Sequence, residues 1–318
     1  DSDFTIAEAV AVKGDRILAV GSDAEILEMT GSETELVDAG GRMVLPGLID
    51  SHLHALGSAM YEFSHEVPAM ETMADVLDYI RERADTLGPG KWIYVSQVFI
   101  TRLREQRYPT RAELDAAAPE NPVVFRTGPD ASLNSLALEL SGIDRDFEIT
   151  DGQPGLIERD AAGNPTGILR QCSRLIKYES PYPEPTDADR IERLKALFAD
   201  YNSVGITSVT EGNTGGHQLA LLRQLLEKEE LSVRVFVNVA LNAQLPMEQI
   251  EAIIAEATED PLHAYNNMLW VRGAKSFMDG GMLTGSAYMS EPWGVSKIYS
   301  IEDPEYRGMH YIEPDKLY

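Results

Sequence analysis

The chain has 318 residues, of which 43% are hydrophobic and 25% are charged, the balance of an ordinary water-soluble globular protein. The formal net charge of −25 and the pI near 4.5 give a surface that repels nucleic acids and anionic membranes, so we expect neither as a partner. A single cysteine, Cys172, excludes an internal disulfide and fits a cytoplasmic location, and no apolar stretch reaches the roughly 18–20 residues of a membrane span.

The first 43 residues predict a small β-unit. Short strands are expected at residues 8–12, 16–21, 35–38 and 42–44. The first two flank Gly14, which is typical of a hairpin turn. Residues 23–27 predict a short helix between the two pairs of strands.

The chain then enters an apolar run that ends in two histidines, His52 and His54. Pro46 and Gly47 mark the turn into this strand. In a strand, residues i and i+2 point to the same face, so two imidazoles can converge on one metal ion with metal–nitrogen bonds of about 2.0–2.1 Å. Asp50 shares that face and is a candidate to orient them. A lone His-x-His pair is more often a surface or core pair, but its position at the end of a buried-looking strand favours a metal site.

Residues 55–186 interrupt the regular pattern and predict an inserted domain. Residues 72–87 have one apolar face and predict a helix. Residues 110–113 have the spacing of a capping box, which predicts the start of a short helix. Strands are expected at 91–99, 122–127, 156–160 and 166–169, the last two as a hairpin. The proline-rich residues 180–185 predict the linker that leaves this domain.

From residue 187, helices and strands alternate. Helices are expected at 187–202, 217–228 and 247–257, and strands at 206–210, 233–240 and 270–277. This alternation predicts an α/β fold with a parallel sheet or barrel. The His-x-His strand is then the first barrel strand and 270–277 the fourth, so residues 44–54 and 187–318 are assigned to the barrel.

Three further polar residues lie near the ends of these strands. Lys275 is close to the end of the fourth strand, Asp279 follows it, and Glu211 follows the second strand. A (β/α) barrel keeps its chemistry at the carboxyl ends of its strands, so each residue is a candidate for the site. The alternative for Lys275 is a solvent-exposed or Asp279-paired lysine, and for the two acids a simple loop charge.

Residues 45–54, Leu-Pro-Gly-Leu-Ile-Asp-Ser-His-Leu-His, resemble the first barrel strand of the amidohydrolase superfamily. The chain is similar to the family-3 branch in further segments, at residues 14–21, 109–115, 133–135, 163–167, 205–209 and 275–280. Their order and number carry the resemblance. One departure lies at residues 127–132, where relatives often have a histidine and this chain has none, so a substrate contact through that histidine has no counterpart here.

The resemblance implies a (β/α)8 TIM-like metallohydrolase barrel, only part of which this chain holds, with a small N-terminal β-sandwich and a large insertion after strand one. It implies that His52 and His54 bind a divalent metal, with Zn²⁺ favoured. It also implies that carbon dioxide carboxylates Lys275, which then bridges a second ion. Two more metal-binding histidines and a catalytic aspartate are implied on later strands, beyond residue 318, so we expect a longer polypeptide.

The expected reaction is hydrolysis of an amide or other C–N bond in a small molecule, with a metal-bound hydroxide as the nucleophile. Glu211 and Asp279 are expected to contact the substrate. One open alternative is deamination, or another metal-dependent hydrolase or lyase reaction on the same scaffold. The other is a non-catalytic binding protein with a decayed site. A homo-oligomer is compatible with the sequence.

Overall fold

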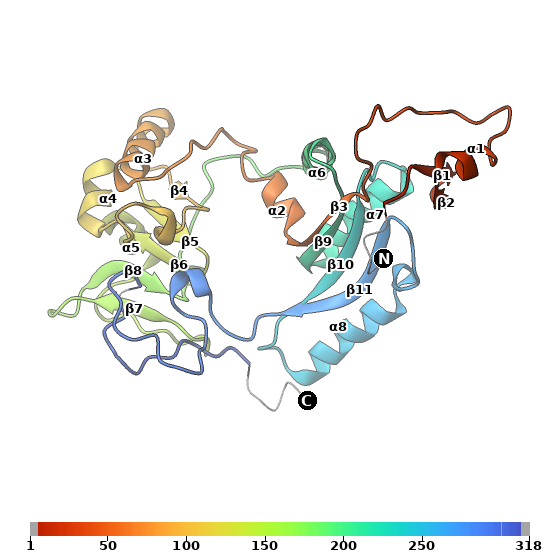
Figure 1. Cartoon of the computed structure of the whole chain (residues 1–318). Helices are drawn as coiled ribbons and strands as arrows, with labels where there is room; N and C mark the ends of the chain where they lie inside the picture. Colours follow the sequence, from red (N-terminus) through yellow and green to blue (C-terminus); the bar gives the residue numbers. More distant parts are fainter. Residues whose placement is uncertain (1–5, 300, 313–318) are drawn as a thin grey trace. The chain divides into compact units, whose positions relative to one another are not determined.

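The computed structural model describes residues 6–299 and 301–312, and the chain divides into two units, Asp1–Pro46 and Gly47–Tyr318 (Figure 1). In the first unit, β1 (Ala9–Lys13) and β2 (Arg16–Gly21) form an antiparallel pair. The helix α1 (Asp23–Leu27) follows, with Ser22 and Glu25 forming a capping box. The predicted hairpin and short helix are therefore confirmed.

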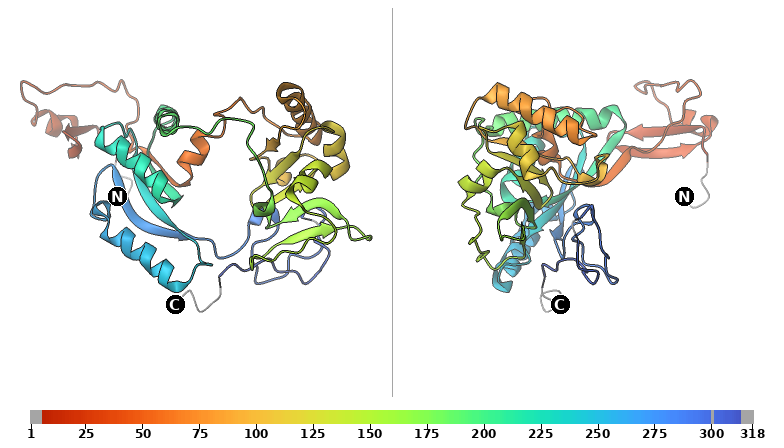
Figure 2. Two further views of the ribbon diagram at one scale, coloured as in Figure 1. Left: turned by 180° about the vertical axis from the view of Figure 1, so that it is seen from behind. Right: turned by 90° about the vertical axis from the view of Figure 1, so that its left-hand side faces the viewer.

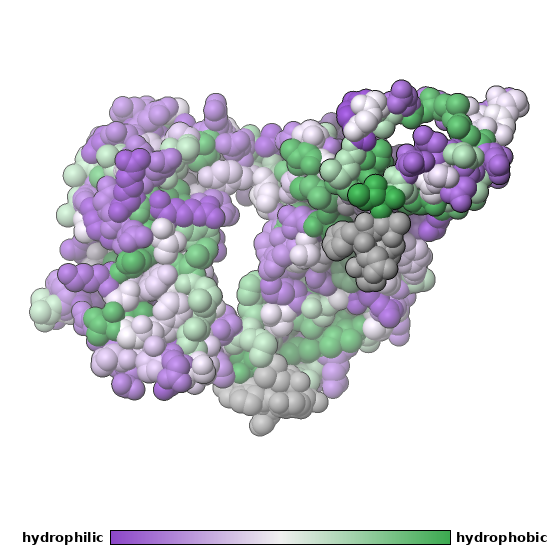
Figure 3. Space-filling model, in the orientation of Figure 1, coloured by the Kyte–Doolittle hydropathy of each residue, from purple (hydrophilic) through white to green (hydrophobic). Residues whose placement is uncertain are grey.

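The strands predicted at residues 35–38 and 42–44 are wrong, because both segments lack regular structure. Their apolar side chains Val37 and Met43 are about four-fifths exposed. A strand is stable only when its backbone groups pair with a neighbour, and no such neighbour is present in the described part of this unit. The hairpin also exposes apolar residues, and Figure 3 shows part of this unit as green, hydrophobic surface at the upper right.

The second unit contains a four-stranded sheet in which every neighbouring pair is parallel. Its strands are β3 (Leu48–Leu53), β9 (Ile206–Thr214), β10 (Arg234–Leu241) and β11 (Leu269–Ser276), in the order β11-β10-β9-β3. Sequence order thus equals spatial order, which confirms the predicted succession of strands one to four. Closure into a barrel stays a prediction.

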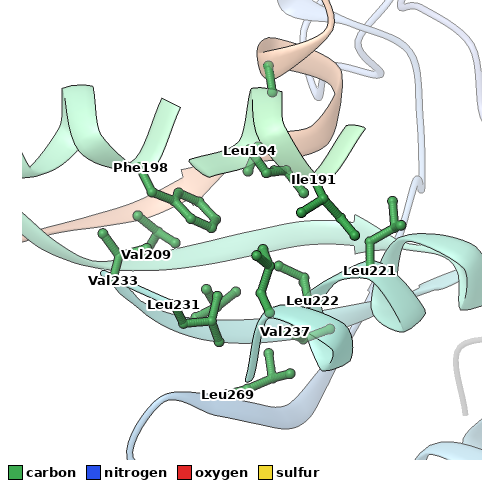
Figure 4. Packing of buried hydrophobic residues seen from close by; sticks show 14 of the residues in the cluster. Ile191, Leu194, Phe198, Val209, Leu221, Leu222, Leu231, Val233, Val237 and Leu269 are labelled. Carbon is green, nitrogen blue, oxygen red and sulfur yellow. The ribbon is translucent and has the colours of Figure 1, made fainter. Parts of the chain in front are cut away.

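Three helices connect these strands and run beside the sheet, as the further views in Figure 2 show: α6 (Asp187–Ser203), α7 (Gly216–Glu227) and α8 (Met247–Glu259). The core lies between the sheet and α6 and α7. Phe198 of α6 and Leu221 of α7 are fully buried against valines of the strands (Figure 4). Leu225 of α7 is fully buried in the same cluster. α8 contributes no buried residue.

A second, mixed sheet is built by residues between β3 and α6. Its order is β4-β5-β6-β8-β7, and only β4 and β5 are parallel. The strands are β4 (Ile93–Val95), β5 (Val123–Thr127), β6 (Asp130–Leu133), β7 (Leu156–Arg159) and β8 (Pro165–Arg170). The helices that accompany this sheet are α3 (Met73–Leu87), α4 (Arg111–Ala117) and α5 (Ser135–Ser141). The short helix α2 (Ala55–Ala59), which follows β3, instead packs in the core of the parallel sheet through Ala55 and Ala59.

The predicted helices at 72–87 and after residue 110 are confirmed, with Thr72 and Thr110 as their capping residues. The predicted hairpin is confirmed as β7 and β8. The strand expected at 91–99 is shorter: only β4 forms, residues 96–99 are irregular, and a 3₁₀ turn, η1 (Ile100–Arg102), follows. Among the helices and strands, three were not predicted, namely α2, β6 and α5.

Three more 3₁₀ turns complete the described elements: η2 (Ser173–Leu175), η3 (Pro261–His263) and η4 (Met282–Thr284). After β11 the chain packs on the mixed sheet, where Tyr299 joins its core and Gln171 donates to Ser286. The boundaries proposed at 55–186 and 187–318 stay predictions. None of the helices in the described residues is long and apolar enough to cross a membrane.

Candidate functional site

The two histidines of the predicted site lie where β3 ends. β3 starts at Leu48. The preceding Gly47 packs so closely on Thr207 of β9 that a Cβ atom on Gly47 would overlap the threonine side chain. His52 lies in β3, and His54 is the N-cap residue of α2. The local spacing and the register with β9 together place both imidazoles at the carboxyl end of the parallel sheet.

The two imidazole rings are side by side. Their centroids are 5.6 Å apart and their planes are almost perpendicular, at 89°. Two imidazoles that share one tetrahedral ion have ring centres roughly 5 Å apart, given metal–nitrogen bonds of about 2.0–2.1 Å. The observed centroid separation is therefore compatible with two imidazole ligands of a single ion.

One nitrogen of His54 is already engaged. Nδ1 lies 2.5 Å from the carbonyl oxygen of Gly212, which can only accept, so Nδ1 carries the hydrogen. The lone pair of the neutral ring is then on Nε2, the nitrogen that faces away from this contact. Metal-binding histidines are usually oriented in this way, through a hydrogen bond from the other ring nitrogen.

Glu211 of β9 is the third residue at this position. Its side chain is only 5% exposed, and one carboxylate oxygen lies 3.8 Å from Nδ1 of His54. The other oxygen accepts a hydrogen bond from the backbone N–H of Ala55, the first residue of α2. Burial raises the pKa of Glu211 to about 7, although the hydrogen bond from Ala55 opposes this shift. A buried carboxyl group thus lies beside the histidine pair.

Lys275 and Asp279 lie against other partners. Lys275 is near the end of β11, the edge of the sheet opposite β3, and its Nζ lies 4.9 Å from the ring centroid of Phe277. Lys275 is therefore three strand-to-strand steps, of about 4.8 Å each, away from the histidines across the sheet. Asp279 accepts a hydrogen bond from the backbone N–H of Tyr288 at 2.8 Å. The structure therefore brings Glu211, but not these two residues, to the histidine pair.

Asp50 acts on the backbone. Its Oδ1 accepts a hydrogen bond from the backbone N–H of His52 at 3.0 Å. The group that orients a ring in this structure is the Gly212 carbonyl, which sequence reasoning missed. Every residue carries a carbonyl, so only the pairing of β3 with β9 identifies it.

Two imidazoles are a partial metal site. A catalytic zinc usually has three protein ligands and an open position. Within residues 6–299 and 301–312, no three His, Cys, Asp or Glu side chains are grouped so that they could hold a metal ion. The four remaining histidines make contacts away from this site. His65 contacts Tyr79, His217 contacts Asp187, His263 contacts Val271, and His310 contacts Tyr288.

The sequence matches the family-3 profile of the amidohydrolase family over residues 35–307. The chain therefore belongs to the amidohydrolase family. The resemblance to the amidohydrolases, drawn from the His-x-His strand and the further segments, is confirmed.

Two curated relatives show how the match is distributed. The N-substituted formamide deformylase of Arthrobacter pascens is 33% identical over 70% of this chain and 42% of its own length. The protein LONG AFTER FAR-RED 3 of Arabidopsis thaliana is 25% identical over the whole chain and 53% of its own length. The chain thus spans about half the length of these relatives.

A solved structure supports the fold. An uncharacterized metal-dependent hydrolase from Pyrococcus horikoshii superposes with a TM-score of 0.57 and 21% identity, covering 97% of this chain and 57% of that one. A second such hydrolase, from Pyrococcus furiosus, superposes with a TM-score of 0.55. The chain therefore has the fold of part of a metal-dependent hydrolase.

Proposed function

We propose that this chain is part of a metal-dependent hydrolase that cleaves an amide or other C–N bond in a small molecule. The observation that carries the proposal is the pair His52 and His54 at the carboxyl end of β3. Their ring centroids are 5.6 Å apart, and Nδ1 of His54 donates to the carbonyl oxygen of Gly212. Membership of the amidohydrolase family supports the same reaction class.

His52 and His54 would hold a divalent ion, for which Zn²⁺ is the proposed identity because imidazole suits it. When bound, such an ion polarises a carbonyl and lowers the pKa of water. Glu211 fixes the position of α2 through Ala55 and adds negative charge beside His54 once it is ionised. Since its side chain is 5% exposed, Glu211 is better placed to position His54 than to reach a substrate.

Lys275 is proposed as a further ligand, after carboxylation by carbon dioxide. The lysine amine must be neutral to attack carbon dioxide, and the product is an anionic oxygen ligand. Lys275 is partly buried at the same end of the sheet as the histidines, which supports this role. Asp279, three residues beyond β11, stays the proposed substrate contact.

The substrate test begins with N-substituted formamides, because the Arthrobacter relative is named for them. The natural full-length protein, loaded with Zn²⁺ and bicarbonate, is mixed with a panel of N-formyl and N-acyl amines, and the released amine is measured. The proposal predicts release that stops after chelator treatment and returns with metal. Release of ammonia from amino-heterocycles alone would favour deamination, and no turnover by metal-loaded protein would favour the binding-protein alternative.

A further inference from the structure

A pocket of about 180 Å³ lies beside α3 and β4. Its walls come from the segment after α2, from α3 and β4, and from the segment before α6. Among the described residues that line it, none is a residue of the proposed metal site. The proposed hydrolase chemistry therefore leaves this pocket without a role.

Aromatic rings form much of the wall. The His65 ring lies roughly parallel to the rings of Tyr79 and Tyr182, with centroid separations of 6.1 and 5.5 Å. The rings of Tyr94 and Tyr178 form a second aromatic pair, with their centroids 4.8 Å apart. An apolar cavity of about 150 Å³ accommodates benzene. The size and the walls of this pocket thus fit a single planar ring.

Arg83 supplies a positive charge at the wall. It donates to the hydroxyl of Tyr182 at 2.5 Å, which is a neutral partner. Arg81, on the same helix, instead pairs with the carboxylate of Asp78. The carboxylates of Glu62 and Glu82 act electrostatically on His65, but both side chains are exposed to solvent. The charge of Arg83 is therefore available to an anionic group inside the pocket.

Two nitrogens of this wall lack hydrogen-bond partners within the described residues, although both are covered: Nε of Arg83 and Nδ1 of His65. Nε2 of His65 lies 2.7 Å from the Tyr79 hydroxyl. Burial raises the pKa of Tyr79 to about 12, so the hydroxyl keeps its proton and can donate to Nε2. Nδ1 then carries a hydrogen, and small rotations would turn both N–H groups toward an acceptor. Buried donors without partners are uncommon in native proteins.

We propose that this pocket binds a small planar aromatic carboxylate. The ring lies among the tyrosines, and the carboxylate accepts hydrogen bonds from Arg83 and His65. The chemistry follows from the combination of aromatic walls, one cation without a carboxylate partner, and two N–H donors. This site is additional to the metal site and does not depend on the proposed hydrolysis.

The probe is benzoate, with benzyl alcohol as a neutral ligand of similar size. Binding is measured by ligand-observed NMR on the natural full-length protein after chelator treatment, so that coordination of benzoate to a metal cannot contribute. We expect saturable binding of benzoate and affinity for benzyl alcohol weaker by about tenfold or more, since a charge-assisted hydrogen bond contributes about 1.5–3 kcal/mol. Equal affinity for both ligands, or no saturable binding, would overturn the proposal.

Variants locate the site. R83Q removes the charge and should weaken benzoate binding about tenfold, whereas R81Q, the matched control on the same helix, should change it less than about twofold. S64F places a ring in the pocket from an exposed position, with little risk to the fold, and should abolish binding. Circular dichroism confirms that each variant is folded. Benzoate affinity that is unchanged in folded R83Q and S64F, or lowered equally by R81Q, would contradict the proposal.

Discussion

The carboxylate of Glu211, in β9, and the imidazole of His54, directly after β3, approach to 3.8 Å although the two residues are far apart in sequence. The approach depends on the parallel pairing of β3 with β9, in which Leu53 is opposite Glu211. The same pairing brings the Gly212 carbonyl to Nδ1 of His54. The pairing of the first two strands of the sheet therefore determines how the histidine is held.

Replacing Glu211 with Gln tests its positioning role. Gln keeps an oxygen that can accept from Ala55, so the fold should persist, but the charge beside His54 is lost. We expect zinc affinity, measured by competition with a chelator, to fall about 10- to 100-fold, as for other groups that orient a metal ligand. The control is Glu192→Gln, because Glu192 is exposed and pairs with Lys195 on α6. Unchanged affinity in E211Q would show that Glu211 has no such role.

Replacing Lys275 with Gln tests the carboxylated lysine. A carbamate that bridges two ions implies about two ions per chain in the natural full-length protein and about one in K275Q. Depletion of bicarbonate should lower the metal content of the natural protein but not that of the variant. Lys297→Gln is the control, since Lys297 is exposed. If K275Q retains the natural metal content, Lys275 is not a ligand.

The regular elements could be predicted because their signals are local. The Thr72 cap with its apolar helix face, and the valines of β10, each lie within one segment. β6 was missed because it carries Asp130 and Ser132, which are typical of loops. These residues are buried because Arg170 pairs with Asp130 and Pro109 accepts from Ser132, and both partners are distant in sequence.

As with the helices and strands, only the local features of the candidate metal site could be predicted. The sequence singles out His52 and His54 by their spacing, and it singles out Glu211 as a residue expected just after the next strand, whereas in the structure Glu211 lies within β9. The Gly212 contact depends on strand register, which single-sequence patterns do not specify. The strands expected at 35–38 and 42–44 failed for the opposite reason, because their local pattern was suitable but a partner strand was missing in the described residues.

Acid should weaken the contact between Glu113 and Arg107. Hydrogen bonds from Arg107 hold the pKa of Glu113 at about 2, below its ordinary value of 4.5. The stabilisation is therefore complete above about pH 4.5 and is lost as the pH falls toward 2. We expect E113Q to lower the free energy of unfolding in urea at pH 7 by at most about 1 kcal/mol, because the pair is partly exposed. The difference from the natural protein should shrink at pH 3. If the difference in unfolding free energy between E113Q and the natural protein were the same at pH 3 and pH 7, the ion pair with Arg107 would not be its origin. The control is Glu139→Gln, at an exposed site on α5.

Truncation of Phe198 tests the core between α6 and the sheet. The side chain is fully buried, so Phe198→Ala should lower the free energy of unfolding by about 3–5 kcal/mol. Ile254→Ala on α8 is the matched control. Because Ile254 is 44% exposed, its truncation should lower the free energy of unfolding by much less. Urea unfolding followed by circular dichroism measures both. Equal losses would mean that α6 does not form the core described here.

The most direct test of the metal site is metal content by elemental mass spectrometry, on the full-length protein purified without chelators. We expect about one or two divalent ions per chain, and loss of at least one in the double variant His52→Asn with His54→Asn. His217→Asn should match the natural protein, because His217 contacts Asp187 on the protein surface. Unchanged metal content in the double variant, or no metal in the natural protein even after incubation with zinc and bicarbonate, would contradict a metal site at His52 and His54.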